Sequence, residues 1–293
     1  MLIALIRSLR PKQWTKNGLL FAGYLFTIQQ GHSTADLLKV IASFGIFCAV
    51  SGATYMINDV VDIECDRIHP RKCKRPIASG SLPVTAATVA AVLMLGVSIW
   101  LAFRLGTAFG AITVAYLALT LSYSARLKHI VIVDVLAIAA GFVARAVAGA
   151  VVIHVAISPW LLLCTTLLAL FLGLAKRRSE LLTLENGGLD HRKTLGEYTA
   201  PMLDQMLGVT ASATLMAYCL YTFTAVSATT GKLHPAMMIT IPFVVYGLFR
   251  YMFLIHSRNA GGSPELVLLE DKPMLLNVVL YVVAAVIALK LRF

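Results

Sequence analysis

The chain has 293 residues, of which 59% are hydrophobic and only 13% are charged, and its formal net charge is +11. Soluble globular proteins carry about 25% charged residues, so this composition excludes an ordinary soluble fold and indicates an integral membrane protein. The excess of Lys and Arg does not indicate nucleic-acid binding, because these residues gather on one side of the predicted membrane topology.

Nine apolar segments are candidates for membrane-spanning helices, which usually take about 17 to 25 residues. They lie at 17–30, 37–57, 84–103, 106–124, 131–153, 158–175, 201–227, 235–256 and 273–291. The first is the shortest, and its polar ends, Asn17 and Gln29, predict a tilt or a break. No linker of Pro, Gly or Ser divides the chain, so we expect one all-α, membrane-embedded domain over 1–293.

Lys and Arg are distributed unequally between the two sides of these spans. If the amino terminus is cytoplasmic, 19 of the 25 Lys and Arg residues fall on the cytoplasmic side. Basic residues favour that side of a membrane, so the pattern predicts an amino terminus inside and a carboxyl terminus outside. The predicted protein is a multi-pass protein of the cell membrane, with inner loops at 58–83, 125–130, 176–200 and 257–272.

The first inner loop begins with acidic residues. Between Asn58 and Gly80 there are four acidic and five Lys or Arg residues, a density that favours a functional site in a membrane protein. Asn58, Asp62 and Asp66 recur every four residues and would share one face of a helix, with Asp59 beside them. Such oxygen ligands suit Mg²⁺, which completes its coordination with water and substrate phosphates. The alternative is an acidic run that only caps a helix end.

Basic side chains follow these carboxylates at once, as expected where a phosphate binds beside a metal ion. They are Arg67, His69, Arg71, Lys72, Lys74 and Arg75. The predicted metal ligands are Asn58, Asp62 and Asp66. The predicted catalytic residues are Asp59, Asp62, Asp66 and Arg67.

Polar residues also border other spans. Lys16 lies at the start of the first span and can turn inward, and Tyr123 and Lys128 follow the fourth, where a tyrosine otherwise belongs to the aromatic belt. Arg145 lies deep in the fifth span, eleven residues after Asp134 and on the same helical face. Asp134 is too distant along a straight helix to neutralise it directly. Arg145 is therefore predicted to bind an anion inside the bundle.

The loop after the sixth span begins with a basic cluster. Lys176, Arg177 and Glu180 fall within about one helical turn, and Gly187 and Gly188 would then break the helix. A positive-inside anchor is the alternative to a phosphate site.

With these residues assembled, the chain resembles the UbiA-type superfamily of intramembrane prenyltransferases over essentially its whole length. The resemblance rests on Asn58-x-x-x-Asp62-x-x-x-Asp66, on the segment RPIASG that begins at Arg75, and on Tyr123 with Lys128. It implies a nine-helix bundle whose cytoplasmic loops cap a central cavity, with a lateral opening to lipid for an isoprenoid chain.

The sequence departs from superfamily members that prenylate aromatic rings, which carry a second Asp-x-x-x-Asp motif after the sixth span. Here the loop begins KRRSE at Lys176, and with the amino-terminal RPKQWTKN it is similar to the decaprenyl-phosphate phosphoribosyltransferase branch. That branch transfers 5-phosphoribose from phosphoribosyl diphosphate to a polyprenyl phosphate for cell-envelope glycan precursors, releasing diphosphate. Lys and Arg suit the additional phosphate of such substrates.

This resemblance implies a Mg²⁺-dependent transfer at the anomeric carbon, with positioning and electrostatics in place of a strong general base. The implied partners are phosphoribosyl diphosphate, a polyprenyl phosphate and the membrane, without nucleic acid; a homo-oligomer is compatible with them. The predicted substrate-binding residues are Lys16, His69, Lys74, Arg75, Tyr123, Lys128, Arg145, Lys176, Arg177 and Glu180.

Two other functions stay open. An aromatic or quinone-pathway polyprenyltransferase would use the same fold, but it would be expected to carry the second acidic motif. A transporter would be expected to place polar residues in the outer half of several spans, which is nearly bare of them here.

Overall fold

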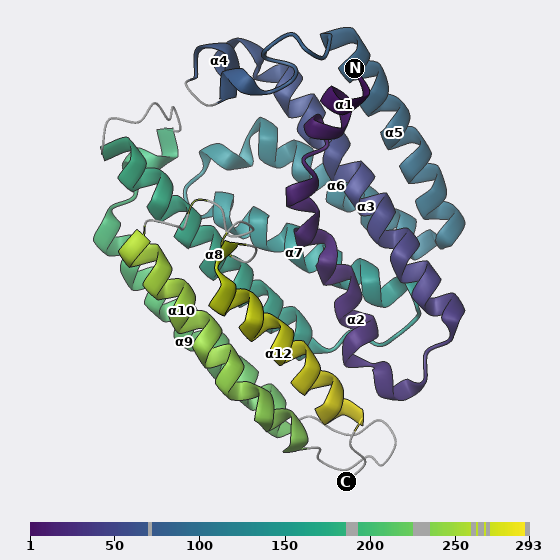
Figure 1. The fold of residues 1–293 in the computed structure, drawn as a ribbon, viewed down its shortest axis with the longest axis vertical. Coiled ribbons are helices and arrows are strands. Elements are labelled where there is room, and N and C mark those ends of the chain that lie inside the picture. The colour runs from purple at the N-terminus through teal and green to yellow at the C-terminus, as the bar shows by residue number, and fades with distance from the viewer. Residues whose placement is uncertain are drawn as a thin grey trace.

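The computed structural model describes residues 1–69, 72–185, 193–224, 235–258, 262, 267 and 270–290, and every regular element within them is a helix (Figure 1). The long helices are α3 (Thr34–Val61), α5 (Val84–Leu105), α6 (Thr107–Ala125), α7 (Val133–Val152), α8 (Pro159–Glu185), α9 (Ala200–Thr224), α10 (Ile241–Arg258) and α12 (Lys272–Lys290). The all-α prediction is confirmed, and eight helical segments are long and apolar enough to cross a membrane.

The predicted first span is broken into short pieces. The chain begins with α1 (Leu2–Ser8) and continues through the 3₁₀ helix η1 (Pro11–Leu20), α2 (Phe21–Phe26) and the 3₁₀ turn η2 (Ile28–Gln30). This segment packs closely on α7, because a Cβ atom at Gly149 would collide with the backbone of Leu20 and one at Gly23 would meet Ala150. The apolar pattern alone does not predict these short helical and 3₁₀ pieces, which occur where the segment packs closely on α7.

The long helices differ from the predicted spans mainly at their ends. α3 begins at a capping box in which Ser33 and Asp36 satisfy each other's backbone N–H groups, and it runs on to include Asn58 and Asp59. α8 continues to Glu185, so the basic cluster predicted to open a loop lies on a helix. The predicted break at 187–188 lies outside the described residues.

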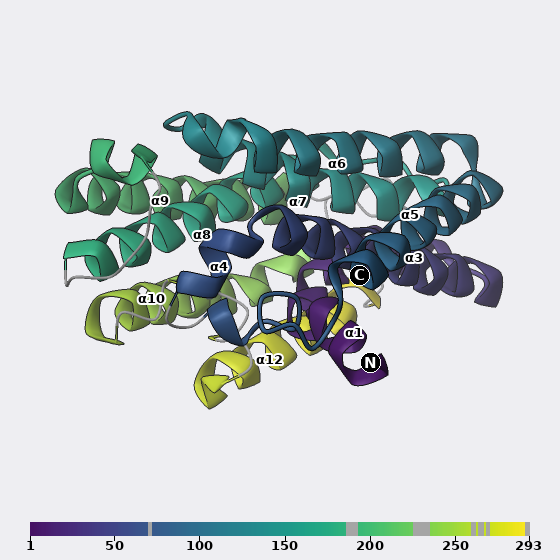
Figure 2. The ribbon, with the colours of Figure 1, turned by 90° about the horizontal axis from the view of Figure 1, so that it is seen from above.

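Short helices connect these elements: α4 (Ile63–Ile68), η3 (Lys72–Lys74), η4 (Leu127–His129), η5 (Lys193–Glu197) and η6 (Pro235–Thr240). In Figure 1, α4 and the amino terminus lie at one end of the bundle and the carboxyl end of α12 lies at the other. Figure 2 looks down on that first end and shows α4 above the middle of the bundle, between the amino-terminal helices and α8.

Two main apolar cores hold the bundle together. One is built from α8, α9 and α10 with residues such as Phe171, Leu207 and Leu254, and the other from the amino-terminal helices with Phe47 and Phe109. α7 contributes to both cores and therefore joins the halves. Many large apolar side chains on α5, α10 and α12 are exposed, as expected for faces that meet lipid.

Candidate active site

The acidic segment lies across the junction of α3 and α4. Asn58 and Asp59 are in the last turn of α3, Asp62 is the junction residue, and Asp66 is on α4. The Asp62 N–H donates to the Asn58 carbonyl at 2.9 Å, and the Asp66 N–H donates to the Asp62 carbonyl at 2.8 Å. Backbone hydrogen bonds four residues apart thus continue through the junction, although Asp62 itself departs from helical geometry, with φ −91° and ψ 11°.

Arg75 joins two of the carboxylates. Its Nη1 lies 3.0 Å from Asp59 Oδ1 and 2.5 Å from Asp66 Oδ2, and both carboxylates are almost fully buried, at 2% and 3% exposed. Arg10, which has a left-handed φ of 52°, reaches Asp59 at 2.5 Å and lies over the ring of Tyr55. The two arginines therefore neutralise the buried acids, while Asp62 and Asn58 are half-buried.

A tight turn holds Arg75 in place. Ile77, Ala78 and Leu82 are buried, and the Leu82 N–H donates to the Pro76 carbonyl. Gly80 has a φ of +77°, a conformation that glycine adopts without strain. The apolar side chains pack against α3 and α5, so the RPIASG segment positions its arginine under the acidic segment.

The other residues of this segment lie nearer the surface. Arg67 pairs with Glu64 at 3.1 Å on an exposed face of α4, and Lys74 is exposed. The His69 Nδ1 accepts a hydrogen bond from the Lys72 N–H at 3.3 Å. Arg71 lies outside the described residues. Arg67, Lys74 and His69 are thus close to the acidic segment in the chain, and Arg75 forms ion pairs with it, as Arg10 does.

A second polar centre lies at the end of α8. Arg177 is only 1% exposed, and its Nε lies 2.6 Å from Asp134 Oδ2 on α7. Its Nη2 donates to the Tyr123 hydroxyl at 2.9 Å, and its Nη1 donates to Glu180. The Lys176 ammonium lies 3.9 Å from the Glu180 carboxylate. The structure therefore brings together residues from α6 and α8 that were predicted to bind substrate.

Asp134 and Tyr198 belong to this centre, although neither was predicted as a site residue. The Tyr198 hydroxyl donates to Asp134 Oδ1 at 3.1 Å and accepts from the Ile132 N–H at 2.7 Å. Burial raises the pKa of that hydroxyl above its usual value, so it remains a hydrogen-bond donor. The sequence does carry one signal for Asp134: a carboxylate inside an apolar span is expected to have a buried polar or charged partner.

Arg145 lies in a third polar centre, at the contact between α7 and the amino-terminal segment. Its Nε donates to Asn17 Oδ1 at 2.8 Å, its Nη1 to the Gly141 carbonyl at 2.8 Å, and its Nη2 to the Tyr116 hydroxyl at 2.6 Å. All three partners are neutral. The guanidinium thus joins α6, α7 and η1, and its predicted binding of an anion stays a prediction.

The two remaining predicted residues lie beside these centres. Lys16 is on η1, where its ammonium donates to Gln13 and lies within electrostatic range of Lys176. Lys128 is half-buried in η4, the turn that connects α6 to α7.

The oxygen donors of the acidic segment suit a hard cation. Mg²⁺ takes one or two carboxylates from a protein and fills its remaining positions with water and substrate phosphates. Among the described residues there is no group of three or more His, Cys, Asp or Glu side chains that could hold a metal ion on its own. The carboxylates of Asp62 and Asp66 and the amide oxygen of Asn58 are oxygen donors of the kind that such an ion takes.

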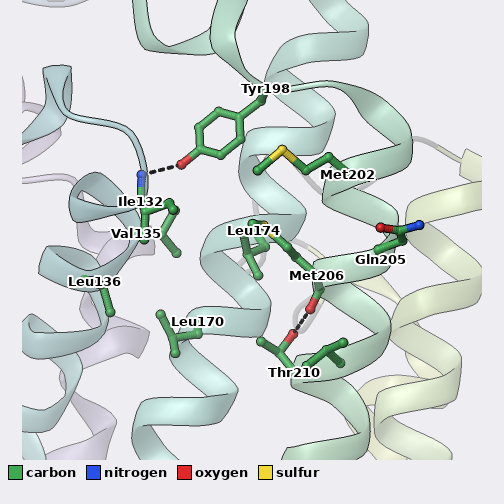
Figure 3. Close-up of a pocket in the computed structure, with 11 residues that line it drawn as sticks. Ile132, Val135, Leu136, Leu170, Leu174, Tyr198, Met202, Gln205, Met206 and Thr210 are labelled. Carbon is green, nitrogen blue, oxygen red and sulfur yellow. Dashed lines mark hydrogen bonds between the residues drawn. The ribbon is translucent and has the colours of Figure 1, made fainter.

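An apolar groove of about 420 Å³ lies between α7, α8 and α9 (Figure 3). Its lining residues are Ile132, Val135, Leu136, Leu170, Leu174, Tyr198, Met202, Gln205, Met206, Val209 and Thr210. Figure 3 shows the ring of Tyr198 beside Met202, with its hydroxyl directed at the backbone of Ile132. None of the predicted site residues lines this groove, and the acidic segment is not part of it.

Comparisons with known proteins agree with this architecture. Residues 19–270 match the UbiA prenyltransferase family. The chain is 34% identical over 287 residues to the decaprenyl-phosphate phosphoribosyltransferase of Corynebacterium glutamicum, which covers 97% of this chain and 86% of that protein. It is 32% identical over 275 residues to the protein of the same name from Mycobacterium tuberculosis, covering 93% and 89%.

Solved structures share the fold. A UbiA homolog from Archaeoglobus fulgidus bound to GPP and Mg²⁺ superposes with a TM-score of 0.70 at 19% identity, over 98% of this chain and 100% of that one. A digeranylgeranylglyceryl phosphate synthase structure gives a TM-score of 0.67 at 17% identity over 99% of each chain.

Proposed function

The chain belongs to the UbiA prenyltransferase family, and on that premise we propose that it is an enzyme that transfers 5-phosphoribose from phosphoribosyl diphosphate to a polyprenyl phosphate of decaprenyl type. The similarity over nearly the whole chain to relatives named for that reaction carries the proposal. Diphosphate is the second product, and the phosphoribosyl lipid would enter the synthesis of cell-envelope glycan precursors.

The acidic segment would bind the diphosphate end of the donor. Asn58, Asp62 and Asp66 would hold Mg²⁺, which when bound supplies positive charge against the departing diphosphate. Arg67 and His69 lie beside this segment and would add to that charge. Asp59 and Arg75 hold each other in place, so that Arg75 faces the same anion. These side chains bind and orient the leaving group rather than transfer a proton.

The centre at the end of α8 would bind a second phosphate group. Lys176 has a side chain that is 38% exposed, and Lys16 and Tyr123 lie within electrostatic range of it. The ammonium groups of Lys16 and Lys176 repel each other, and a bound anion between them would offset this electrostatic repulsion. The remaining predicted substrate residues are Lys74, Lys128, Arg145, Arg177 and Glu180, of which Arg145 and Arg177 are buried among protein partners.

In the reaction, an oxygen of the lipid phosphate would form a bond to the anomeric carbon as the bond from that carbon to the diphosphate oxygen breaks. The attacking oxygen is already ionised, so the step needs no general base. Alignment of the two substrates and stabilisation of the leaving charge would then supply the rate enhancement.

We further propose that the single domain crosses the membrane nine times, with the amino terminus and α4 on the cytoplasmic side. The ten residues of η1 rise about 20 Å and the six of α2 about 9 Å, so with η2 they reach roughly the 30 Å thickness of a hydrocarbon core. In Figure 1 the amino terminus and the carboxyl end of α12 lie at opposite ends of the bundle, which supports an odd number of crossings.

Labelling of Cys65 tests this topology. The side chain is exposed on α4, so a membrane-impermeant maleimide should label it in inside-out vesicles and leave it unlabelled in right-side-out vesicles. The other four cysteines are replaced by Ala, and Thr107→Cys, at the exposed first residue of α6, serves as the reference for the outer side. Labelling of Cys65 from outside would reverse the orientation.

The reaction is tested with purified protein and Mg²⁺ by two substrate pairs. Labelled phosphoribosyl diphosphate with polyprenyl phosphate should give a labelled lipid, whereas polyprenyl diphosphate with 4-hydroxybenzoate should give no product. A chelator should abolish the first product and an excess of Mg²⁺ should restore it. Product from the second pair alone would instead identify an aromatic prenyltransferase, because this outcome requires a different donor.

A further inference from the structure

Consecutive arginines of α8 form ion pairs with two different helices. Arg177 reaches Asp134 on α7 at 2.6 Å, and Arg178 reaches Asp204 on α9 at 2.5 Å. The two pairs differ in burial, since Asp134 is 0% exposed, whereas the Asp204 side chain is 37% exposed. One pair therefore lies inside the bundle and the other nearer its surface.

The buried pair is the centre of a larger network. The three nitrogens of Arg177 contact Asp134, Glu180 and Tyr123 separately. Glu180 in turn lies within ion-pair distance of Lys176. A change in the position of the Arg177 guanidinium would therefore move Glu180 and, through Glu180, the more exposed Lys176. The exposed pair has no such extension, because Asp204 otherwise contacts only His256 among the described residues.

Asp134 is itself fixed by Tyr198. The hydroxyl accepts a hydrogen bond from the Ile132 N–H at 2.7 Å (Figure 3). It also donates to Oδ1 of Asp134, whose Oδ2 lies 2.6 Å from Arg177. The tyrosine ring is packed on the wall of the apolar groove. Tyr198, which precedes α9, thus sets the orientation of the Asp134 carboxylate.

Stability alone does not account for such a pair, because a buried ion pair contributes little more than well-packed apolar residues would. We propose that Asp134 and Tyr198 are positioning residues, which act through Arg177 to hold Tyr123 and the Lys176–Glu180 pair toward the donor's second phosphate. This inference rests on the proposed function. It assigns a role in donor binding to Asp134 on α7 and to Tyr198 just before α9, although neither residue would contact the donor directly.

Asp134→Asn is the primary test, because it keeps the side-chain shape and removes the charge that orients Arg177. KM for phosphoribosyl diphosphate should rise by about tenfold or more, while KM for polyprenyl phosphate stays within about twofold. Tyr198→Phe removes the hydrogen bonds to Asp134 and from the Ile132 N–H, and it should raise the same KM by about threefold through loss of the bond that orients Asp134. The double variant should be no worse than Asp134→Asn, because both residues act through one carboxylate.

Asp204→Asn is the matched control, since it removes the partner of the adjacent arginine on the same helix. It should leave both KM values unchanged. Equal effects of Asp134→Asn and Asp204→Asn, or a fall in kcat without a change in KM, would overturn the proposal. If Asp134→Asn fails to fold, Tyr198→Phe decides the matter, because it retains the ion pair; an unchanged donor KM would then reject the positioning role.

A wild-type protein without phosphoribosyl transfer would refute the proposed function and the identity of the bound anion, whereas the positioning role of Asp134 at an anion site can still be tested. Binding of inorganic phosphate, measured by calorimetry, then provides the test. Weaker binding by Asp134→Asn than by both the wild type and Asp204→Asn supports the positioning role, and equal affinity in all three overturns it.

Discussion

Replacement of Asp62 by Asn is expected to abolish turnover, a loss of about a thousand-fold, while the fold is preserved. Asp62 is half-buried at the junction of α3 and α4 and takes part in no ion pair with other described residues. Its carboxylate is therefore not needed to neutralise a buried charge, and asparagine has the same shape. What the substitution removes is a negative oxygen that faces the proposed metal and diphosphate.

The matched control is Asp36→Asn at the opposite end of the same helix. Asp36 closes the capping box with Ser33, so this variant should melt slightly earlier but retain its transfer rate. Initial rates at saturating substrates and melting curves distinguish the two effects. Full activity of Asp62→Asn would remove this residue from the proposed metal ligands.

Much of the fold could be predicted from the apolar runs, and the polar ends of the first predicted span indicated its break, but the packing of that segment could not be predicted. Eight predicted spans correspond to long helices because their length and composition suffice to specify a helix in lipid. The segment around Asn17 instead packs in short turns against Gly149 and Ala150, two small residues of α7 about 130 positions away. Such a contact depends on tertiary structure, which hydrophobic periodicity does not encode.

The site shows the same distinction between local pattern and pairing across helices. The four-residue spacing of Asn58, Asp62 and Asp66 is matched by backbone hydrogen bonds between them, and the short RPIASG turn brings Arg75 to Asp59 and Asp66. Asp134 was related by helical period to Arg145 on its own helix, but its partner is Arg177 on the next helix. A single sequence carries no direct record of that contact, so both Asp134 and Tyr198 were missed.

Replacement of Arg75 by Gln is expected to impair both stability and transfer, because two buried carboxylates would lose the cation between them. Asp66 would have no remaining ion pair among the described residues, and Asp59 would retain only Arg10. Removing one partner of a buried pair costs about 3–5 kcal/mol, and since the Arg75 side chain is 28% exposed we expect about 2 kcal/mol. Transfer should fall by about a hundred-fold through weaker binding of the departing diphosphate.

Mg²⁺ should distinguish this local charge effect from general loosening of the bundle. A divalent cation can stand in for the missing guanidinium beside Asp66, so Mg²⁺ should raise the melting temperature of Arg75→Gln by more than that of the wild type. Arg250→Gln is the matched control, because Arg250 pairs with Asp271 at 2.9 Å with similar exposure but away from the acidic segment. That variant should melt earlier without an added response to Mg²⁺. An equal response in all three proteins would mean that Arg75 and the metal do not share these carboxylates, and Asp66 would then be a structural partner of Arg75 rather than a metal ligand.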